Sequence, residues 1–201
     1  MIPHSVIVPS ADGKHEFSLS ARRLEAGEIY LDGSITSELL LPVTAVFREC
    51  AQNEQPINLY LNSPGGEVYT GLAIYDLMQD YPFEINVYCI GLAASMAAIL
   101  LAGGRKGQRF ILPHSRVMIH EPLIAEGFGG SATTIKNKAK NILDVRSLVN
   151  GILAKHTGKS LKEIDKATSF DNYMNAEEAI RFGICDEVRS IYDPEETEGC
   201  I

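Results

Sequence analysis

The chain has 201 residues, of which 45% are hydrophobic and 22% are charged, and this suits one globular domain with a sizeable core. Its formal net charge of −8 argues against nucleic acid or an anionic membrane surface as the main partner. No apolar run reaches the length of a membrane span, and no apolar segment follows a basic start, so we expect a cytoplasmic protein.

In chain order, residues 1–16 predict a mobile N-terminal segment with a short hairpin, because prolines and a glycine surround an apolar run. Strands and helices then alternate as far as residue 102. We predict strands at 28–31, 57–61 and 85–90, a turn at 62–66, and helices at 42–52, 67–79 and 94–102. Pro42 fits the first of these helices, because proline is tolerated in a first turn.

The second half of the chain predicts two short strands, at 109–112 and 117–119, and then the longest helix, at 133–156. Apolar residues occupy one face of that helix, so it either projects or packs against a large partner surface. Ser160 and Asn175 begin two shorter helices with capping boxes, and Gly183 ends the second of them. The alternation of strands and helices indicates an α/β class with mainly parallel pairing.

The cysteines are widely spaced and form no C-x-x-C pair; they are Cys50, Cys89, Cys185 and Cys200. We predict that three of them are buried thiols rather than metal ligands or parts of a disulfide framework. We therefore expect no metal site, and the sequence indicates no organic cofactor.

The segment 91–97, GLAASMA, places a single hydroxyl, that of Ser95, at a predicted strand-to-helix turn. A developing oxyanion is stabilised near the positive end of a helix dipole, as at the nucleophile elbow of hydrolases, although the Gly-x-Ser-x-Gly pattern is absent. The alternative is a small residue that lets a helix pack closely.

A nucleophilic serine needs a base and a group that orients the base. Among the histidines, His120 ends an apolar strand, which is a rigid place from which to aim a side chain. The alternative is a hydrogen-bonded histidine at a strand terminus. His156 ends the long helix instead, where a cation suits the helix dipole.

The candidates for the orienting carboxylate are Asp144, Asp165, Asp171 and Asp186. Asp144 lies inside the long helix, Asp165 lies on the exposed side of a short helix, and Asp186 is expected to cap a strand start. Asp171 follows a predicted helix in an apolar setting that suits the orienting role, and its alternative is an N-cap or turn aspartate.

Gly65 and Gly66 follow a predicted strand, and a backbone amide without a neighbouring side chain can approach a substrate closely there. We predict that the N–H groups of Gly66 and Met96 donate to the oxyanion. The alternative is a plain β-turn.

Four segments resemble the proteolytic subunit of the Clp protease (ClpP): LYLNSPGG at 59–66, GLAIYD at 71–76, GLAASMA at 91–97 and MIHEPL at 118–123. The resemblance is colinear from about residue 22 to residue 188. It implies Ser95 as nucleophile, His120 as base and Asp171 as the orienting carboxylate. It also implies oxyanion donors at Gly66 and Met96, and a crotonase-like α/β fold of stacked β-β-α units with a projecting handle helix, here 133–156.

Members of this family build heptameric rings that stack face to face through their handles, and an AAA+ unfoldase feeds them polypeptide. The resemblance therefore implies that this subunit cleaves unfolded polypeptides inside a chamber, while ATP belongs to the partner. It divides the single peptidase domain, 1–201, into an axial segment (1–20), a head (21–121), a handle (122–156), a C-terminal part of the head (157–190) and a flexible acidic tail (191–201). An extended substrate would lie along Gly65, with Leu123 and Ile124 on its other side.

The chain departs from the family pattern at three places. Glu121 stands where glutamine is usual, Phe170 where arginine is common, and Asn58 where a tyrosine is expected in the unfoldase docking groove. We predict an intact peptidase site with altered assembly surfaces, as in a divergent paralogue that co-assembles with a second ClpP paralogue.

The predicted function is that of a Clp-type serine endopeptidase in ATP-dependent proteolysis. One alternative is a crotonase-type acyl-CoA enzyme, which would need a basic pocket, and the nearby basic residues are Arg105, Lys106 and Arg109. The other alternative is a catalytically weak ring subunit with a structural role, although such subunits usually lack one member of the triad.

Overall fold

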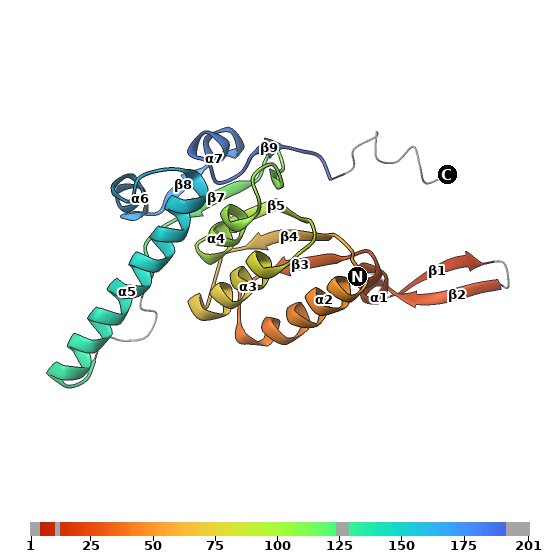
Figure 1. Cartoon of the computed structure of the whole chain (residues 1–201), viewed down its shortest axis with the longest axis horizontal. Helices are drawn as coiled ribbons and strands as arrows, with labels where there is room; N and C mark the ends of the chain where they lie inside the picture. The colour runs from red at the N-terminus through yellow and green to blue at the C-terminus, as the bar shows by residue number, and fades with distance from the viewer. Residues whose placement is uncertain (1–4, 11–12, 124–128, 192–201) are drawn as a thin grey trace.

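The computed structural model describes residues 5–10, 13–123 and 129–191. Its centre is a mostly parallel sheet in the order β3-β4-β5-β6-β9, with β7 paired to both β5 and β8 (Figure 1). The strands are β3 (Glu28–Asp32), β4 (Ile57–Ser63), β5 (Ile85–Ala94), β6 (Arg109–Ile111), β7 (Arg116–Ile119), β8 (Asn172–Met174) and β9 (Glu187–Val188). The predicted α/β class with mainly parallel pairing is confirmed.

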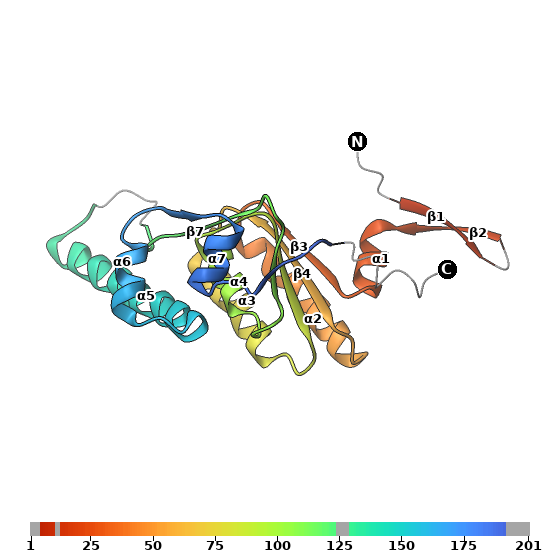
Figure 2. The same ribbon diagram turned by 90° about the horizontal axis from the view of Figure 1, so that it is seen from above.

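Helices α2 (Leu40–Gln52), α3 (Val68–Asp80) and α4 (Met96–Gly103) lie along the same face of the sheet (Figure 2). A short 3₁₀ turn, η1 (Ser37–Leu39), leads into α2. All eight residues of α4 are buried, as expected of a helix that is apolar on every side. The core therefore lies between the sheet and these helices, with α4 at its centre.

The opposite face of the sheet carries a row of aromatic rings. Neighbouring rings lie 4.7–5.0 Å apart between centroids, and the row consists of Tyr30, Tyr60, Tyr88 and Phe110. The strands that contribute them are adjacent and in register, so side chains at matching positions stack across the ladder. The guanidinium of Arg23 lies over the first ring and that of Arg189 over the last.

Strand β5 is longer than predicted, because it continues four residues beyond Ile90 to Ala94. Its first half pairs with β6 and its second half pairs with β7, from Leu92 opposite Arg116 to Ala94 opposite Met118. A register shift against β4 separates the two halves. The small residues of this stretch favour a helix locally, but the new partner strand holds them extended and carries β5 directly to Ser95.

Helix α5 (Ala132–Thr157) projects from the body of the molecule (Figure 1), and its bounds confirm the predicted long helix. Helices α6 (Leu161–Thr168) and α7 (Ala176–Phe182) follow it. Both begin with the predicted capping boxes, at Ser160 and Asn175. Gly183 ends α7 in the left-handed conformation, with φ of 96°, as its position predicted.

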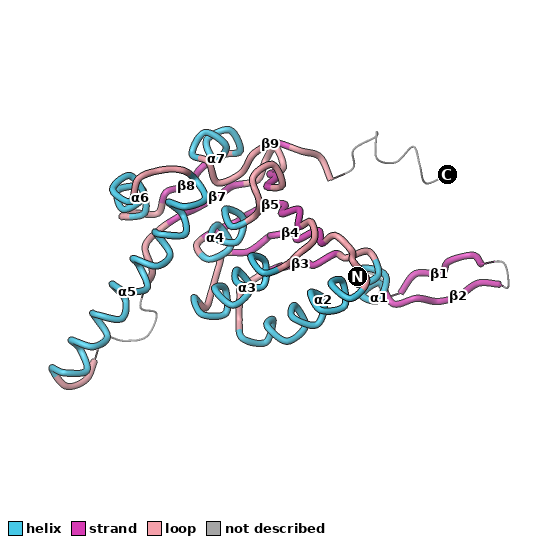
Figure 3. The backbone as a smooth tube through the Cα atoms, viewed as in Figure 1, coloured by secondary structure: helices cyan, strands magenta, loops and turns pink. Residues whose placement is uncertain are grey.

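The N-terminal residues form the predicted hairpin. Strands β1 (Ser5–Ser10) and β2 (Gly13–Ser18) pair antiparallel, and α1 (Leu19–Glu25) connects them to the sheet. The hairpin extends away from the rest of the chain (Figure 3). The predictions made for residues 1–4, for 11–12 and for 192–201 of the acidic tail lie outside the described residues.

Three cysteines are buried and free, as predicted: Cys50, Cys89 and Cys185. Burial raises the pKa of Cys89 to about 11 and that of Cys185 to about 12, so both are protonated thiols at neutral pH. Cys200 lies outside the described residues. Within residues 5–10, 13–123 and 129–191, no cluster of three or more potential metal-ligating side chains occurs. In the same ranges, no helix combines the length and apolarity needed to cross a membrane.

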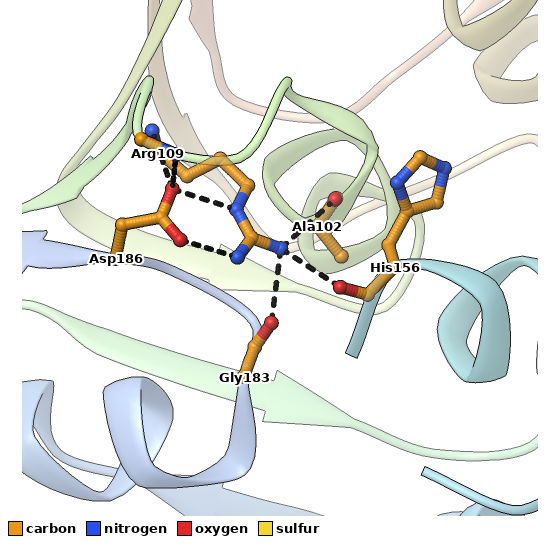
Figure 4. A network of polar contacts seen from close by, with 6 residues as sticks. Ala102, Arg109, His156, Gly183 and Asp186 are labelled. Atoms are coloured by element: carbon orange, nitrogen blue, oxygen red, sulfur yellow. Dashed lines mark hydrogen bonds and ion pairs between the residues drawn. The ribbon is translucent and has the colours of Figure 1, made fainter. Parts of the chain in front are cut away.

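A buried ion pair ties together the ends of several elements beside α4 (Figure 4). The guanidinium of Arg109, in β6, makes two hydrogen bonds to the carboxylate of Asp186, one of them 2.9 Å from Nε to Oδ2. Its remaining nitrogen donates to the carbonyl oxygens of Gly183 at 2.9 Å, His156 at 3.2 Å and Ala102 at 3.4 Å. One side chain thus donates hydrogen bonds to carbonyl oxygens at the C-terminal ends of α4, α5 and α7.

The Asp186 carboxylate also accepts from the N–H groups of Gly107 and Arg109, which is the strand-capping role predicted for it. Burial alone would raise the pKa of Asp186, but the hydrogen bonds and charge of Arg109 outweigh that effect and lower it. The carboxylate therefore stays ionised, and the pair is a permanent link between β6 and the segment that precedes β9.

The expectation of a cationic His156 is wrong. Its Nε2 lies 2.8 Å from the hydroxyl of Tyr75, and burial, together with the charges of Lys155 and Arg109, lowers its pKa to about 4. The dipole of α5 favours a cation at this end, but desolvation and two neighbouring cations are stronger. His156 is therefore neutral at physiological pH.

Because the pKa of His156 is lower in the folded chain than its ordinary 6.5, acid should destabilise the fold through this residue. Its contribution is fully present above pH 6.5 and is lost as the pH falls towards 4, by about 2–3 kcal/mol in total. The free energy of unfolding in urea, measured at both pH values, should fall less in His156→Gln than in the wild type. Equal pH dependence in the two proteins would contradict this assignment.

Candidate active site

Ser95 occupies the turn between β5 and α4, as predicted, with φ of 54° and ψ of −122°. This is a conformation that side chains rarely adopt, and such strain persists only where the surroundings impose it. The N–H of Ser95 donates to the carbonyl of Met118 in β7 at 2.9 Å, while its own carbonyl accepts from Ala98 in the buried α4. The backbone on both sides of Ser95 is thus held, and its hydroxyl is placed at the N-terminus of α4.

His120 follows the last residue of β7, and its Nε2 lies 2.9 Å from Oγ of Ser95. Strand β7 pairs with the second half of β5, so the ends of the two strands reach the same edge of the sheet. The extension of β5 beyond its predicted end is therefore what brings the serine to the histidine. The histidine side chain is 14% exposed, so most of the ring is sheltered from water.

Asp171 completes the arrangement, with Oδ1 lying 3.1 Å from Nδ1 of His120. The residue immediately precedes β8, which pairs antiparallel with β7 and sets Asn172 opposite Ile119. The predicted apolar setting is wrong, because the carboxylate is 64% exposed. Its apolar neighbours Phe170 and Tyr173 point outward and do not cover it.

Gly65 and Gly66 form a strand-like segment rather than a plain β-turn. The C=O of Gly65 accepts from the N–H of Ile35, and the N–H of Glu67 donates to the C=O of Ile35. Because backbone groups alternate along an extended chain, the N–H of Gly66 faces away from Ile35. Gly66 therefore directs its backbone groups away from Ile35, whereas Gly65 already donates to Oγ of Ser63 at 3.1 Å and accepts from Ile35.

Close contact explains why both of these positions are glycine. A Cβ on Gly65 would lie 2.7 Å from the Cβ of Ser95 and 2.7 Å from the carbonyl oxygen of Ala94. A Cβ on Gly66 would lie 2.2 Å from the carbonyl oxygen of Ile35. The same Gly65 Cβ would be 3.0 Å from the nitrogen of Met96, so the glycine segment runs directly past the start of α4.

A small pocket opens beside Ser95 and His120. Apart from those two residues, its lining is apolar and comes from α3, α4, α5 and the end of β7: Val68, Met96, Ile99, Ile119, Pro122, Val149 and Leu153. This pocket was not predicted from the sequence. The signal was present in the apolar face of the long helix, which was interpreted only as a packing surface.

The structure separates the other predicted site residues. Leu123 follows the pocket residue Pro122 and is 73% exposed. Ile124 lies outside the described residues. Asp144 lies within α5, and Asp165 lies on the exposed side of α6, as expected. Of the candidate carboxylates, Asp171 is the one that contacts His120.

The model of the family described as Clp protease matches residues 11–191, which is most of the chain. The chain belongs to the Clp protease family. This confirms the resemblance seen in the four sequence segments. Clp protease family members are serine peptidases of the ClpP type, and the family generally works with Clp ATPases in oligomeric rings.

Two of the three basic residues considered for an acyl-CoA pocket, Arg105 and Arg109, are engaged elsewhere in this Clp protease family chain. Arg109 is 3% exposed and is bound to Asp186. Arg105 donates to the carbonyl of Tyr81 at 2.8 Å. Neither guanidinium is available to an anionic ligand beside Ser95, so these contacts disfavour the acyl-CoA alternative.

Proposed function

We propose that this chain is a serine endopeptidase of the Clp type, with a crotonase-like fold, which cleaves unfolded polypeptides inside an oligomeric chamber. The observation that carries the proposal is the continuous chain of contacts from Oγ of Ser95 through His120 to Asp171, at 2.9 Å and 3.1 Å. A nucleophile, a base and an orienting carboxylate in this order are what acyl transfer to serine needs.

In the proposed reaction, Oγ of Ser95 attacks the peptide carbonyl while Nε2 of His120 takes its proton. The tetrahedral intermediate then collapses, the C–N bond breaks, and the same proton passes to the leaving amine. Water, deprotonated by His120, hydrolyses the resulting ester and restores the serine. Asp171 holds the imidazole with its Nδ1–H towards the carboxylate and stabilises the imidazolium form.

The oxyanion would be held by the backbone N–H groups of Gly66 and Met96. Two observations support this role: the glycine segment runs directly past the nitrogen of Met96, and Met96 is the first residue of α4, where the helix dipole favours negative charge. One such donor is worth about 3 kcal/mol of barrier in a hydrolase. The extended substrate would lie along Gly65 and pair with the backbone of Gly66, with Leu123 and Ile124 on its other side.

The apolar pocket beside Ser95 would accept the side chain next to the cleaved bond. Beyond it, we propose that specificity comes from confinement inside heptameric rings, stacked in pairs through α5. The projecting helix α5 exposes two leucines, Leu143 and Leu148, and this apolar surface is what a second copy of the chain would cover in the proposed stacking. The subunit itself needs no cofactor, and ATP would be consumed by an AAA+ unfoldase.

The unfoldase contact would lie on the sheet face that carries Asn58 and Tyr60. The amide of Asn58 accepts from that of Asn86 at 3.2 Å, so this edge of the aromatic row is polar. Together with Phe170 and Glu121, this supports our proposal that the chain is a divergent ClpP paralogue that assembles with a second paralogue. We propose a cytoplasmic location.

A fluorophosphonate probe tests the proposal directly, because it phosphonylates only a serine that is activated as a nucleophile. We expect it to label the assembled protein at Ser95, with mass spectrometry locating the adduct. Labelling should disappear in Ser95→Ala and persist in Ser147→Ala, which removes an exposed hydroxyl from α5. An assembled protein that resists the probe, or is labelled elsewhere, would refute the proposed activity.

A further inference from the structure

A second cluster of charged side chains lies one residue beyond His120, and its contacts join three elements. Nε of Arg146, in α5, lies 3.2 Å from Oε2 of Glu121, the residue after His120. Another nitrogen of the same guanidinium lies 3.8 Å from Oδ1 of Asp165 in α6. The buried N–H at Nε is not directed along a hydrogen bond, so its contact with Glu121 is an ion pair. Arg146 thus bridges two carboxylates.

A buried polar pair anchors this bridge from the same face of α5. Asn150, one helical turn after Arg146, is 1% exposed and donates to Oδ1 of Asp165 at 2.7 Å. It also contacts the hydroxyl of Thr168, the last residue of α6, which is fully buried. Helix α5 therefore holds α6 at two points along its length.

The backbone connects the same cluster to both segments that carry the proposed triad. The N–H of Glu121 donates to the carbonyl of Thr168 at 2.7 Å. Glu121 directly follows His120, and Thr168 lies three residues before Asp171. The ladder between β7 and β8 thus holds His120 and Asp171 together on one side. This short backbone contact holds them on the other side, where Arg146 pairs with Glu121 and Asp165.

Resting on the proposed peptidase function, we propose that Arg146 is a positioning residue for the triad. By pairing with Glu121 and Asp165, it fixes the position of α5 relative to the two segments that carry His120 and Asp171. Arg146 does not touch the reacting atoms. Its effect reaches them because a small displacement of a catalytic group from its reactive geometry lowers the rate steeply.

The exposure of the cluster distinguishes it from an ordinary surface pair. The side chains of Arg146, Glu121 and Asp165 are 33%, 43% and 52% exposed, whereas those of the isolated pair on α7, Arg181 and Glu177, are 66% and 80% exposed. An isolated exposed pair contributes little, but a guanidinium shared between two carboxylates is held in one geometry. Arg181→Ala is therefore the matched control for Arg146→Ala.

The test measures hydrolysis of a short fluorogenic peptide by the assembled protein. Arg146→Ala and Glu121→Ala should each lower kcat by about ten- to a hundredfold while KM stays within about twofold, because the geometry of the triad changes but the substrate contacts do not. The double variant should be no slower than either single variant, because each substitution already removes the same contact between Arg146 and Glu121. Glu121→Asp keeps the negative charge that pairs with Arg146 and should retain more of the rate than Glu121→Ala. Arg181→Ala should match the wild type.

Three results would overturn the inference: a wild-type kcat in Arg146→Ala, independent losses that multiply in the double variant, or a loss of rate that follows loss of the assembled particle on a sizing column. If Arg146→Ala does not fold, the comparison of Glu121→Ala with Glu121→Asp decides, and equal rates would overturn it. Failure of the proposed function looks different, because peptide cleavage by the wild type would then survive Ser95→Ala.

Discussion

Ser95→Ala should lower kcat for peptide hydrolysis by about 10⁴-fold or more while leaving the fold and its assembly intact. The hydroxyl is the only group of Ser95 that enters the proposed reaction. The strained backbone at this position is held by Met118 and by α4, and neither contact involves the hydroxyl. The comparison of purified wild type and variant, with kcat from a fluorogenic peptide and particle size from a sizing column, provides the measurement.

His120→Ala should cause a loss of similar size, and the variant that lacks both side chains should be no slower than either single variant. The serine and histidine act as one unit, so the second substitution removes nothing further. Asp171→Asn should cause a smaller loss, because its carboxylate is 64% exposed and water already screens its effect on the imidazolium. A Ser95→Ala protein that retains more than about 1% of the wild-type kcat would exclude the proposed mechanism.

Arg109→Met should lower the free energy of unfolding by about 3–5 kcal/mol, the range found when one partner of a buried ion pair is removed. The substitution keeps most of the side-chain volume but leaves Asp186 charged without its partner. It also leaves three carbonyl oxygens, of Ala102, His156 and Gly183, without their donor. Urea unfolding followed by circular dichroism, at one fixed protein concentration, measures the loss.

Two further variants distinguish the effect of losing the buried network from the effect of losing a positive charge. Arg181→Ala removes an arginine from an exposed pair on α7 and should change the free energy of unfolding by no more than about 0.5 kcal/mol. The combination of Arg109→Met with Asp186→Leu should be less destabilised than the two single losses added together, because no unpaired charge remains buried. If Arg109→Met were as stable as Arg181→Ala, the network would have no structural role.

Local signals were sufficient to predict most elements and one part of the site. The helix at 133–156, the capping boxes at Ser160 and Asn175, and the left-handed Gly183 all follow from spacing and residue type within a few positions. Ser95 was predicted at its turn because a β-strand pattern changes into a helical one around it. Burial of the three described cysteines followed from their apolar neighbours.

Local signals failed wherever distant partners decided the outcome. The helix was predicted to begin at Ala94, but residues 91–94 are extended, because β7 pairs with Leu92–Ala94 and the helix begins at Met96. His156 is neutral although it ends a helix, because Tyr75 and neighbouring elements bury it. Asp171 is exposed although apolar residues surround it in sequence, because Phe170 and Tyr173 turn outward.

The amino-acid sequence by itself determined the family, most of the order of strands and helices, and the candidates for the proposed chemistry, since these depend on side-chain type and short-range spacing. It did not predict α1 or β8. Only the tertiary structure decided that Ser95, His120 and Asp171 meet, across separations of 25 and 51 residues along the chain. It alone also revealed the pocket beside them and the bridge through Arg146. Such contacts depend on the register of paired strands and on where each helix packs against its neighbours. The spacing of residues within one strand or helix predicts neither of these.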